Sequence, residues 1–283
     1  MPTLGLGTWE NEDPAQCAES VRTALEMGYR HVDTAQIYGN EAAVGEGIDA
    51  AAVDRENVFL ATKVWISNLA PEDVVATAEA SLEKLGVDAV DLLYVHWPAG
   101  EYDPEETLPA FDELVDRGLT ERVGVSNFEP HHVERAMDVL DAPVFANQVE
   151  THPFCQQSTL RAHADEHGYE LVAYSPLARG SVFDHDVVRD VAAARDVSPA
   201  PVSLAWLAEK GVTAIPKATS EAHIRDNWES RSLELSAEAV ARIDDIERHH
   251  REVHPDFGPD AWERARPLRR RRPGDDASVG RPG

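Results

Sequence analysis

Strand-like and helix-like segments alternate eight times along the 283 residues, and this alternation restricts the fold more than any other feature. The strand segments are short apolar runs, and the segments between them carry apolar residues at the three- and four-residue spacing of amphipathic helices. The expected strands are residues 4–8, 31–35, 58–64, 90–97, 122–126, 144–149, 171–175 and 212–216. The expected helices are residues 14–27, 41–50, 71–85, 105–116, 130–139, 158–167, 199–209 and 221–228, followed by an extra helix at 236–247.

Strands that are apolar on both faces indicate a parallel sheet covered by helices. Eight repeats in fewer than 300 residues favour a closed barrel over an open doubly wound sheet. No break in composition marks a second domain, so we expect one α/β domain, a (β/α)₈ TIM barrel of residues 1–255 with an extra C-terminal helix. Pro, Gly and Arg accumulate after it, and residues 256–283 are predicted to be a C-terminal tail, disordered in large part.

The charge balance argues against two classes of partner. The chain has 52 acidic and 26 basic residues and a net charge of −26, which disfavours nucleic acid and anionic membrane surfaces. Only four of the basic residues are lysines, a composition that predicts a surface adapted to high salt, with an acidic enzyme from a GC-rich genome as the alternative. Two cysteines, no apolar run of membrane-spanning length and a start unlike a signal peptide predict a cytoplasmic protein.

Polar residues follow three neighbouring strands of the predicted barrel, at the ends where barrel enzymes carry their active sites. Asp33 lies in the second expected strand with Tyr38 five residues beyond, Lys63 lies in the third, and His96 lies near the end of the fourth. Taken singly, Asp33 could cap a helix, Tyr38 could be a surface ring and His96 a core imidazole. Lys63 lies in an apolar run and must be paired or reach solvent. Together the four form a convergent set.

The chain resembles the aldo-keto reductase family, in its short-loop prokaryotic form, from residue 5 to about Asn227. The motifs that carry the resemblance, in family order, are Asp33-Thr34-Ala35, Tyr38-Gly39-Asn40-Glu41, Thr62-Lys63, His96-Trp97-Pro98, Gly124-Val125-Ser126-Asn127-Phe128 and Ile215-Pro216-Lys217. The resemblance implies an oxidoreductase that reduces aldehydes or ketones with a nicotinamide cofactor, and it makes Asp33, Tyr38, Lys63 and His96 the catalytic tetrad.

The tetrad also has a physical rationale. Hydride transfer to a carbonyl creates an alkoxide, so a proton donor is needed beside the oxygen, and Tyr38 would supply it. Lys63 would lower the phenol pKa, Asp33 would hold Lys63 charged, and a neutral His96 would orient the substrate oxygen. This scheme uses no metal ion, and we predict no metal site.

The cofactor must bind without a Rossmann fingerprint, because Gly5-Leu6-Gly7 lacks the third glycine and the helix that should follow. Ser126, Asn127 and Gln148 could hydrogen-bond a carboxamide, and Tyr174 could stack on a nicotinamide ring. The resemblance assigns them these roles and adds the other cofactor-binding residues: Gly7, Thr8, Ser175, Leu177, Lys217, Ala218, Thr219, His223, Asp226 and Asn227.

NADPH is the expected cofactor and NADH is the alternative. Many relatives carry an arginine at the position of His223, where it holds the 2′-phosphate of NADPH. Arg225 cannot simply replace it, because residues two apart on a helix point to different sides. Lys217 remains as a charge partner for the phosphate.

Three tryptophans follow strand ends near the tetrad: Trp9, Trp65 and Trp97. The resemblance makes them walls of an apolar substrate pocket, and ordinary packing at the barrel rim is the alternative. In some relatives the C-terminal segment covers this pocket, but the tail of this chain has little apolar content for that role. His163 and His167 have a spacing that metals use, yet no third ligand is evident, and we expect both to face solvent.

The sequence therefore predicts a small-molecule carbonyl reductase that is a monomer or a weak oligomer. One alternative is a regulatory subunit that senses the nicotinamide cofactor. Another is a metal-dependent barrel hydrolase, which would need several histidines and carboxylates at the strand ends.

Overall fold

Eight short strands pair in parallel in the order in which they occur along the chain. The computed structural model describes residues 1–259, and its strands are β1 (Leu6–Gly7), β2 (His31–Asp33), β3 (Phe59–Val64), β4 (Leu92–Val95), β5 (Val123–Ser126), β6 (Val144–Glu150), β7 (Glu170–Tyr174) and β8 (Thr213–Ala214). Parallel bridges from Leu4 to Ala214 and from Gly7 to Lys217 join the last strand to the first. The sheet therefore closes into the expected barrel, and the carboxyl ends of all strands lie on one face.

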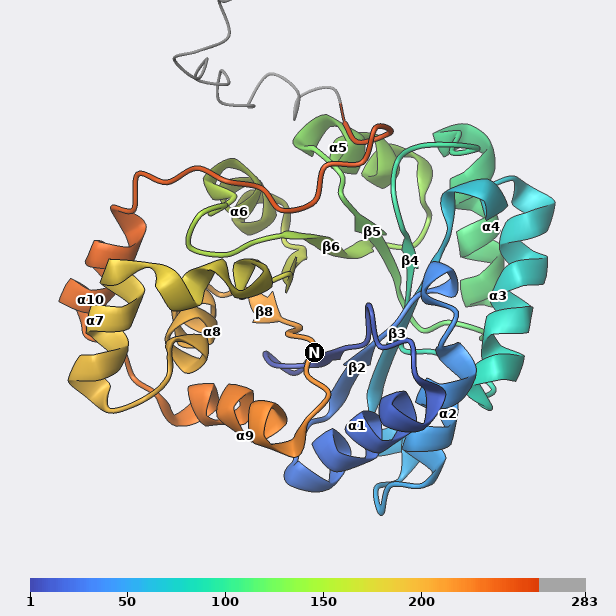
Figure 1. Ribbon diagram of the computed structural model, residues 1–283. Coiled ribbons are helices and arrows are strands. Elements are labelled where there is room, and N and C mark those ends of the chain that lie inside the picture. The colour runs from blue at the N-terminus through green and yellow to red at the C-terminus, as the bar shows by residue number, and fades with distance from the viewer. Residues whose placement is uncertain (260–283) are drawn as a thin grey trace, which may run out of the picture.

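Helices surround the barrel on its outer side (Figure 1). They are α1 (Pro14–Met27), α2 (Glu41–Asp49), α3 (Pro71–Leu85), α4 (Pro104–Asp116), α5 (Pro130–Val139), α6 (Ser158–His167), α7 (Asp186–Arg195), α8 (Pro199–Glu209), α9 (Glu221–Glu229) and α10 (Ala237–Asp244). The Asp13 side chain caps α1 by accepting a hydrogen bond from the backbone N–H of Gln16. Gly86 and Gly168 end α3 and α6 in left-handed conformations, which glycine adopts without steric cost.

Helix α7 is absent from the helices expected from the sequence. It follows an irregular 3₁₀ segment, Ala178–Asp184, in which Arg179 and Gly180 have positive φ angles of 47° and 97°. Only Val188, Val191 and Ala192 of α7 are buried, so its apolar pattern is short. The connection after β7 is therefore longer and more structured than the single expected helix.

The core has two layers. Inside the barrel, small and medium side chains such as Ala61, Ala146 and Val172 pack around Tyr94. A larger cluster fills the space between the strands and the helices. Closure at the seam depends on Gly7, because a Cβ there would lie 2.6 Å from the Ile215 carbonyl oxygen.

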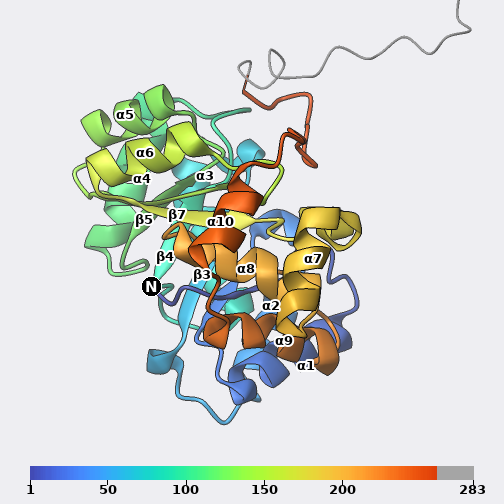
Figure 2. The same cartoon turned by 90° about the vertical axis from the view of Figure 1, so that its left-hand side faces the viewer.

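The chain after α10 returns across the molecule, past α6 and toward α5 (Figures 1 and 2). The N–H of His250 donates to the Phe154 carbonyl at 2.8 Å. The N–H groups of Glu252 and Val253 donate to the two carboxylate oxygens of Glu150, at 2.6 and 2.9 Å. Residues 256–259 of the expected tail are described and follow this anchored stretch; residues 260–283 lie outside the described residues.

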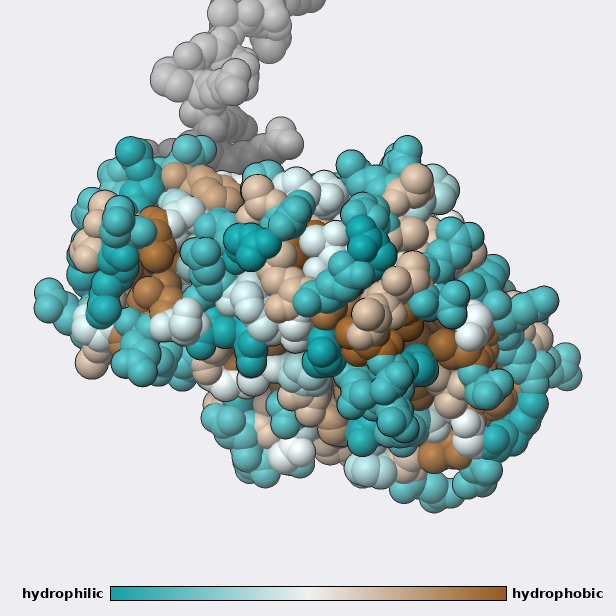
Figure 3. Space-filling view, turned by 90° about the horizontal axis from the view of Figure 1, so that it is seen from below, coloured by the Kyte–Doolittle hydropathy of each residue, from teal (hydrophilic) through white to brown (hydrophobic). Residues whose placement is uncertain are grey.

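No helix within residues 1–259 combines the length and apolar character needed to cross a bilayer. Hydrophilic side chains spread over the face shown in Figure 3 and surround smaller hydrophobic areas. This face fits a chain with twice as many acidic as basic residues.

Candidate active site

The four residues of the predicted tetrad converge at the carboxyl ends of β2, β3 and β4. Asp33 is the last residue of β2, Lys63 lies in β3, and Tyr38 ends the 3₁₀ turn Gln36–Tyr38. Lys63 Nζ donates to Oδ1 of Asp33 and, at 2.7 Å, to the Thr34 carbonyl, and it lies 3.5 Å from the Tyr38 hydroxyl. The ring of His96 meets the Tyr38 ring edge-on, with 5.9 Å between centroids. The fold therefore brings the set together.

Lys63 and Asp33 form a fully buried ion pair, since their side chains are 0% and 2% exposed. Burial lowers the pKa of the Lys63 ammonium, and the Asp33 carboxylate opposes that shift. Burial raises the pKa of Asp33, and hydrogen bonds from Lys63 and Gln148 oppose it. Such a pair is stable only because its hydrogen-bonding groups find partners.

Tyr38 corrects one expectation. Burial raises its pKa well above the ordinary value, and the negative charge of Asp33 adds to the shift. The sequence predicts that Lys63 lowers this pKa, but the ammonium directs its hydrogen bonds to Asp33 and the Thr34 carbonyl, and the phenol oxygen lies at the limit of hydrogen-bond distance. In this structure burial and the Asp33 carboxylate therefore both favour the protonated phenol.

The surroundings of His96 favour the neutral imidazole. Burial lowers its pKa well below the ordinary value, and the positive charge of Lys63 acts in the same direction. Its Nδ1 is buried and has no hydrogen-bond partner within residues 1–259. A neutral imidazole beside a phenol can donate or accept one further hydrogen bond, which suits the orientation of a substrate oxygen.

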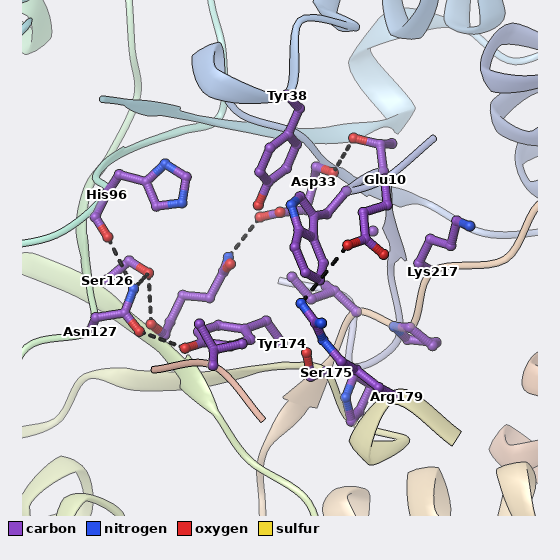
Figure 4. A pocket seen from close by; sticks show the side chains of 18 of the residues that line it. Glu10, Asp33, Tyr38, His96, Ser126, Asn127, Tyr174, Ser175, Arg179 and Lys217 are labelled. Carbon is purple, nitrogen blue, oxygen red and sulfur yellow. Dashed lines mark hydrogen bonds and ion pairs between the residues drawn. The ribbon is translucent and has the colours of Figure 1, made fainter. Parts of the chain in front are cut away.

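The predicted carboxamide-binding residues form a hydrogen-bonded wall next to the tetrad (Figure 4). The Ser126 hydroxyl donates to the Gln148 carbonyl at 2.8 Å, and Asn127 Nδ2 donates to the Ser126 hydroxyl at 3.1 Å. The Tyr174 hydroxyl donates to Oδ1 of Asn127 at 2.8 Å. Gln148 Nε2 donates to Oδ2 of Asp33 at 2.7 Å, so this wall and the tetrad share one carboxylate.

A cavity of about 520 Å³ opens above these groups. Among the residues predicted for the site, those lining it are Gly7, Thr8, Trp9, Asp33, Tyr38, Trp65, His96, Trp97, Ser126, Asn127, Gln148, Tyr174, Ser175, Leu177 and Lys217. Lys63 does not line the cavity, and its Nζ contacts two residues that do, Asp33 and Tyr38. The predicted residues Ala218, Thr219, His223, Asp226 and Asn227 do not line the cavity.

The C-terminal segment enters this cavity, which corrects the expectation that it lacks the apolar content to do so. Val253, Pro255 and Phe257 line the cavity. The Phe257 ring meets Trp65 and Trp97 edge-on, at 5.9 and 5.4 Å between centroids. A single aromatic residue of this segment therefore contributes to the cavity wall, because its ring packs against two tryptophan rings.

Charged side chains line another part of the cavity. The Arg179 guanidinium lies 4.4 Å from the Trp9 ring centroid, and its Nη2 lies 3.9 Å from a carboxylate oxygen of Glu10 (Figure 4). Lys217 lies on the same side and is exposed. Neither Glu10 nor Arg179 is among the sequence-predicted residues, because Arg179 lies in the irregular connection after β7 and no periodic pattern marks it.

The remaining predicted cofactor residues lie along α9 and the loop before it. The Asp226 carboxylate accepts a 2.6 Å hydrogen bond from Ser198, and Asn227 is buried. Arg225 pairs with Glu221 one turn away at 2.6 Å, and His223 is exposed. Arg225 is therefore engaged elsewhere, in agreement with the sequence argument.

Comparisons with known proteins agree with this geometry. The model of the Aldo/keto reductase family matches residues 3–248. The chain is similar to the 9,11-endoperoxide prostaglandin H2 reductase of Trypanosoma cruzi, with 39% identity over 89% of each chain. It is 37% identical to the methylglyoxal reductase DkgB of Escherichia coli O157:H7 over 93% of this chain and 99% of that one. The crystal structure of MGS-M4, an aldo-keto reductase enzyme from a Medee basin deep-sea metagenome library, superposes with a TM-score of 0.86 at 31% identity, covering 92% of this chain and 96% of that one.

Proposed function

Since the chain belongs to the aldo/keto reductase family and is an oxidoreductase that acts on carbonyl groups, we propose that it reduces small aldehydes or ketones with NADPH and takes the proton from Tyr38. The relatives are reductases, and none of those compared above is a regulatory subunit or a metal-dependent hydrolase. The observation that carries the proposal is the convergence of Tyr38, Lys63, Asp33 and His96 beneath one apolar cavity.

Each tetrad residue has one task in this proposal. Tyr38 keeps its proton until an alkoxide, a far stronger base than a phenolate, develops beside it. Lys63 stabilises the negative charge left on the phenol oxygen, and Asp33 fixes the position of the ammonium. The neutral His96 holds the substrate oxygen near Tyr38, so that the proton has a short path.

The residues present fit a nicotinamide dinucleotide. The side-chain amides of Asn127 and Gln148 and the ring of Tyr174 lie beside the tetrad, where a carboxamide and its flat ring need them. Lys217 and Arg179 supply positive charge further along the cavity, where the cofactor is anionic. When bound, the cofactor supplies the hydride. Ala218, Thr219, His223, Asp226 and Asn227 would hold the adenosine end, and Lys217 would face the 2′-phosphate.

Small carbonyl compounds suit the space available. The cavity of about 520 Å³ has to accommodate the nicotinamide as well as the substrate, and its walls include Trp65, Trp97 and Phe257. The DkgB relative is named for methylglyoxal, a small compound of the kind this pocket would admit. The aromatic walls would exclude water and favour apolar substituents beside the carbonyl.

We also propose a cytoplasmic location and a monomeric or weakly associating chain with a salt-adapted surface. Cys17 and Cys155 are both unpaired, as in reducing compartments. The net charge of −26 repels other copies at low salt, and added salt screens that repulsion.

A substrate panel tests the proposal. The purified chain is supplied with methylglyoxal, an aromatic aldehyde and a simple ketone, each with NADPH or NADH, from low salt to molar KCl, and loss of the reduced-nicotinamide absorbance is followed. We expect turnover with NADPH that rises with KCl. A preference for NADH of about tenfold, equal to about 1.4 kcal/mol, would reverse the cofactor assignment, and no turnover under any condition would refute the activity.

A further inference from the structure

Helices α5 and α6 bring two histidines and a glutamate together on the outside of the barrel. Figure 2 shows the two helices next to each other, and His163 Nε2 lies 3.5 Å from the Glu134 carboxylate. One ligand atom from each of Glu134, His163 and His167 lies within 4.8 Å of the other two. The sequence shows the pair of histidines but not the third ligand, because Glu134 lies on the preceding helix. None of the three lines the active-site cavity.

His163 is arranged as a metal ligand, and it does not face solvent as the sequence suggests. Its side chain is only 10% exposed. The Nδ1 atom lies 2.9 Å from the hydroxyl of the buried Tyr169. Nε2 is buried, has no hydrogen-bond partner within residues 1–259, and lies 3.5 Å from the Glu134 carboxylate. A hydroxyl that accepts the Nδ1 proton leaves the Nε2 lone pair free for a metal, which is the usual arrangement around zinc-bound histidine.

The other two ligands complete the set from exposed positions. The His167 ring stacks on the His163 ring, with 4.1 Å between centroids and 28° between planes, so the His167 ring has to turn out of this stack before both nitrogen lone pairs point at one ion. His167 and Glu134 are both exposed, so a solvated ion can reach them and their side chains can adjust to it. Asp165 and Glu166, which lie between the two histidines in the chain, add negative charge nearby.

The donor chemistry selects the ion. Two imidazole nitrogens and one carboxylate oxygen, with water in a fourth position, suit tetrahedral Zn²⁺. Magnesium and calcium prefer oxygen ligands throughout. The acidic chain raises the local concentration of every divalent cation to a similar degree. The preference for zinc over magnesium and calcium therefore comes from the two imidazole nitrogens.

We propose that Glu134, His163 and His167 form a Zn²⁺ site that links α5 to α6 and stabilises this side of the barrel. The ion would bind only the folded chain, because the three ligands come from two helices. Zinc at about 100 times its dissociation constant is then expected to raise the melting temperature by roughly 5 °C.

The test uses the full chain without an affinity tag, freed of metal by a chelator and titrated with ZnCl₂ in a buffer that does not bind zinc. We expect one equivalent of zinc in calorimetry, a rise in melting temperature, and no comparable effect of MgCl₂. His167→Ala should weaken binding at least about tenfold, equal to about 1.4 kcal/mol, while leaving the zinc-free melting temperature unchanged because the side chain is exposed. Glu134→Gln should weaken binding in the same direction.

His249→Ala is the matched control, since it removes an exposed imidazole outside the cluster. It should bind zinc as the unaltered chain does. Cobalt(II) supplies a second readout, because its visible absorption bands are strong only in a tetrahedral site. The proposal is overturned if the unaltered chain binds no zinc, if His167→Ala binds it equally well, or if His249→Ala abolishes binding. In each of those cases Glu134, His163 and His167 do not form a zinc site.

Discussion

Gln148 Nε2 donates a 2.7 Å hydrogen bond to Oδ2 of Asp33, while Lys63 donates to the other oxygen of the same carboxylate. The residue that we propose for the cofactor carboxamide is therefore joined directly to Asp33, the proposed partner of the catalytic ammonium. A substitution at Gln148 should therefore also affect the Lys63–Asp33 pair.

We expect Gln148→Ala to reduce kcat and weaken NADPH binding together. Removing the donor leaves a buried carboxylate oxygen without a partner, at a cost of about 1–3 kcal/mol in stability. The same loss expressed in the transition state corresponds to about ten- to 100-fold in kcat. Steady-state kinetics, cofactor titration and denaturant unfolding measure the three effects.

Asn147→Ala is the control for that change. Asn147 is the neighbouring buried amide on β6, and its Nδ2 donates to the Phe128 carbonyl at 2.9 Å, away from the cavity. Asn147→Ala should lower the free energy of unfolding by a similar amount and leave kcat nearly unchanged. Equal losses of kcat in both variants would show that the effect comes from the fold and not from the link to Asp33.

Tyr38→Phe should lower kcat by about 10²–10⁴-fold, the usual contribution of a positioned general acid. The ring remains, so NADPH should bind with an unchanged dissociation constant in a fluorescence titration. Tyr29→Phe is the comparison, because it removes the hydroxyl of a buried tyrosine outside the cavity, which donates one hydrogen bond to the Ile224 carbonyl at 3.0 Å. That variant should cost about 1 kcal/mol in stability and leave kcat intact; a Tyr38→Phe enzyme that turns over normally refutes the assignment.

The pH profile of kcat/KM for reduction should be flat from about pH 6 to about pH 9. Burial raises the pKa of Tyr38 above this range, so the acid stays protonated, and burial lowers the pKa of His96 below it, so the imidazole stays neutral. A rate that titrates near the ordinary histidine pKa of about 6.5 would contradict the neutral role of His96.

The same depressed pKa predicts the direction of a stability change. A group whose folded pKa lies below its unfolded value contributes stability above the unfolded pKa and loses it as pH falls toward the folded pKa. The free energy of unfolding should therefore fall as pH drops below about 6.5, and His96→Gln should show a smaller fall. Denaturant midpoints of the two proteins at matched salt measure the difference.

Glu150→Gln should raise KM for aromatic aldehydes several-fold with kcat and NADPH affinity close to normal. The Glu150 carboxylate accepts hydrogen bonds from the N–H groups of Glu252 and Val253, and this stretch leads to Phe257 in the pocket. A glutamine has one acceptor oxygen, so one of these N–H groups would lose its partner. The segment should then hold Phe257 less firmly against Trp65 and Trp97.

Combining Glu150→Gln with Phe257→Ala checks the route of the effect. If Glu150 acts by positioning Phe257, the double variant should have the KM of Phe257→Ala alone, because the effects of two substitutions that act through the same contact do not add. Full additivity would mean that Glu150 affects the substrate by another route.

The sequence by itself determined the barrel and the positions of the tetrad. Alternating apolar runs and amphipathic helices require a parallel sheet covered by helices, and Gly86 and Gly168 end their helices where left-handed backbone is needed. Asp33, Lys63 and His96 were visible because strand ends in a parallel barrel meet on one face, so three local patterns predict one site.

Only the tertiary structure decided which groups far apart in the sequence come into contact. Phe257 of the C-terminal segment lies against Trp65 and Trp97, and Glu134 of α5 lies 3.5 Å from His163 of α6. The pKa of Tyr38 is likewise raised by burial and by the charge of Asp33, both of which come from the fold around the side chain. Periodicity reports which face of an element is buried, whereas these contacts depend on distances across the fold that no local pattern contains.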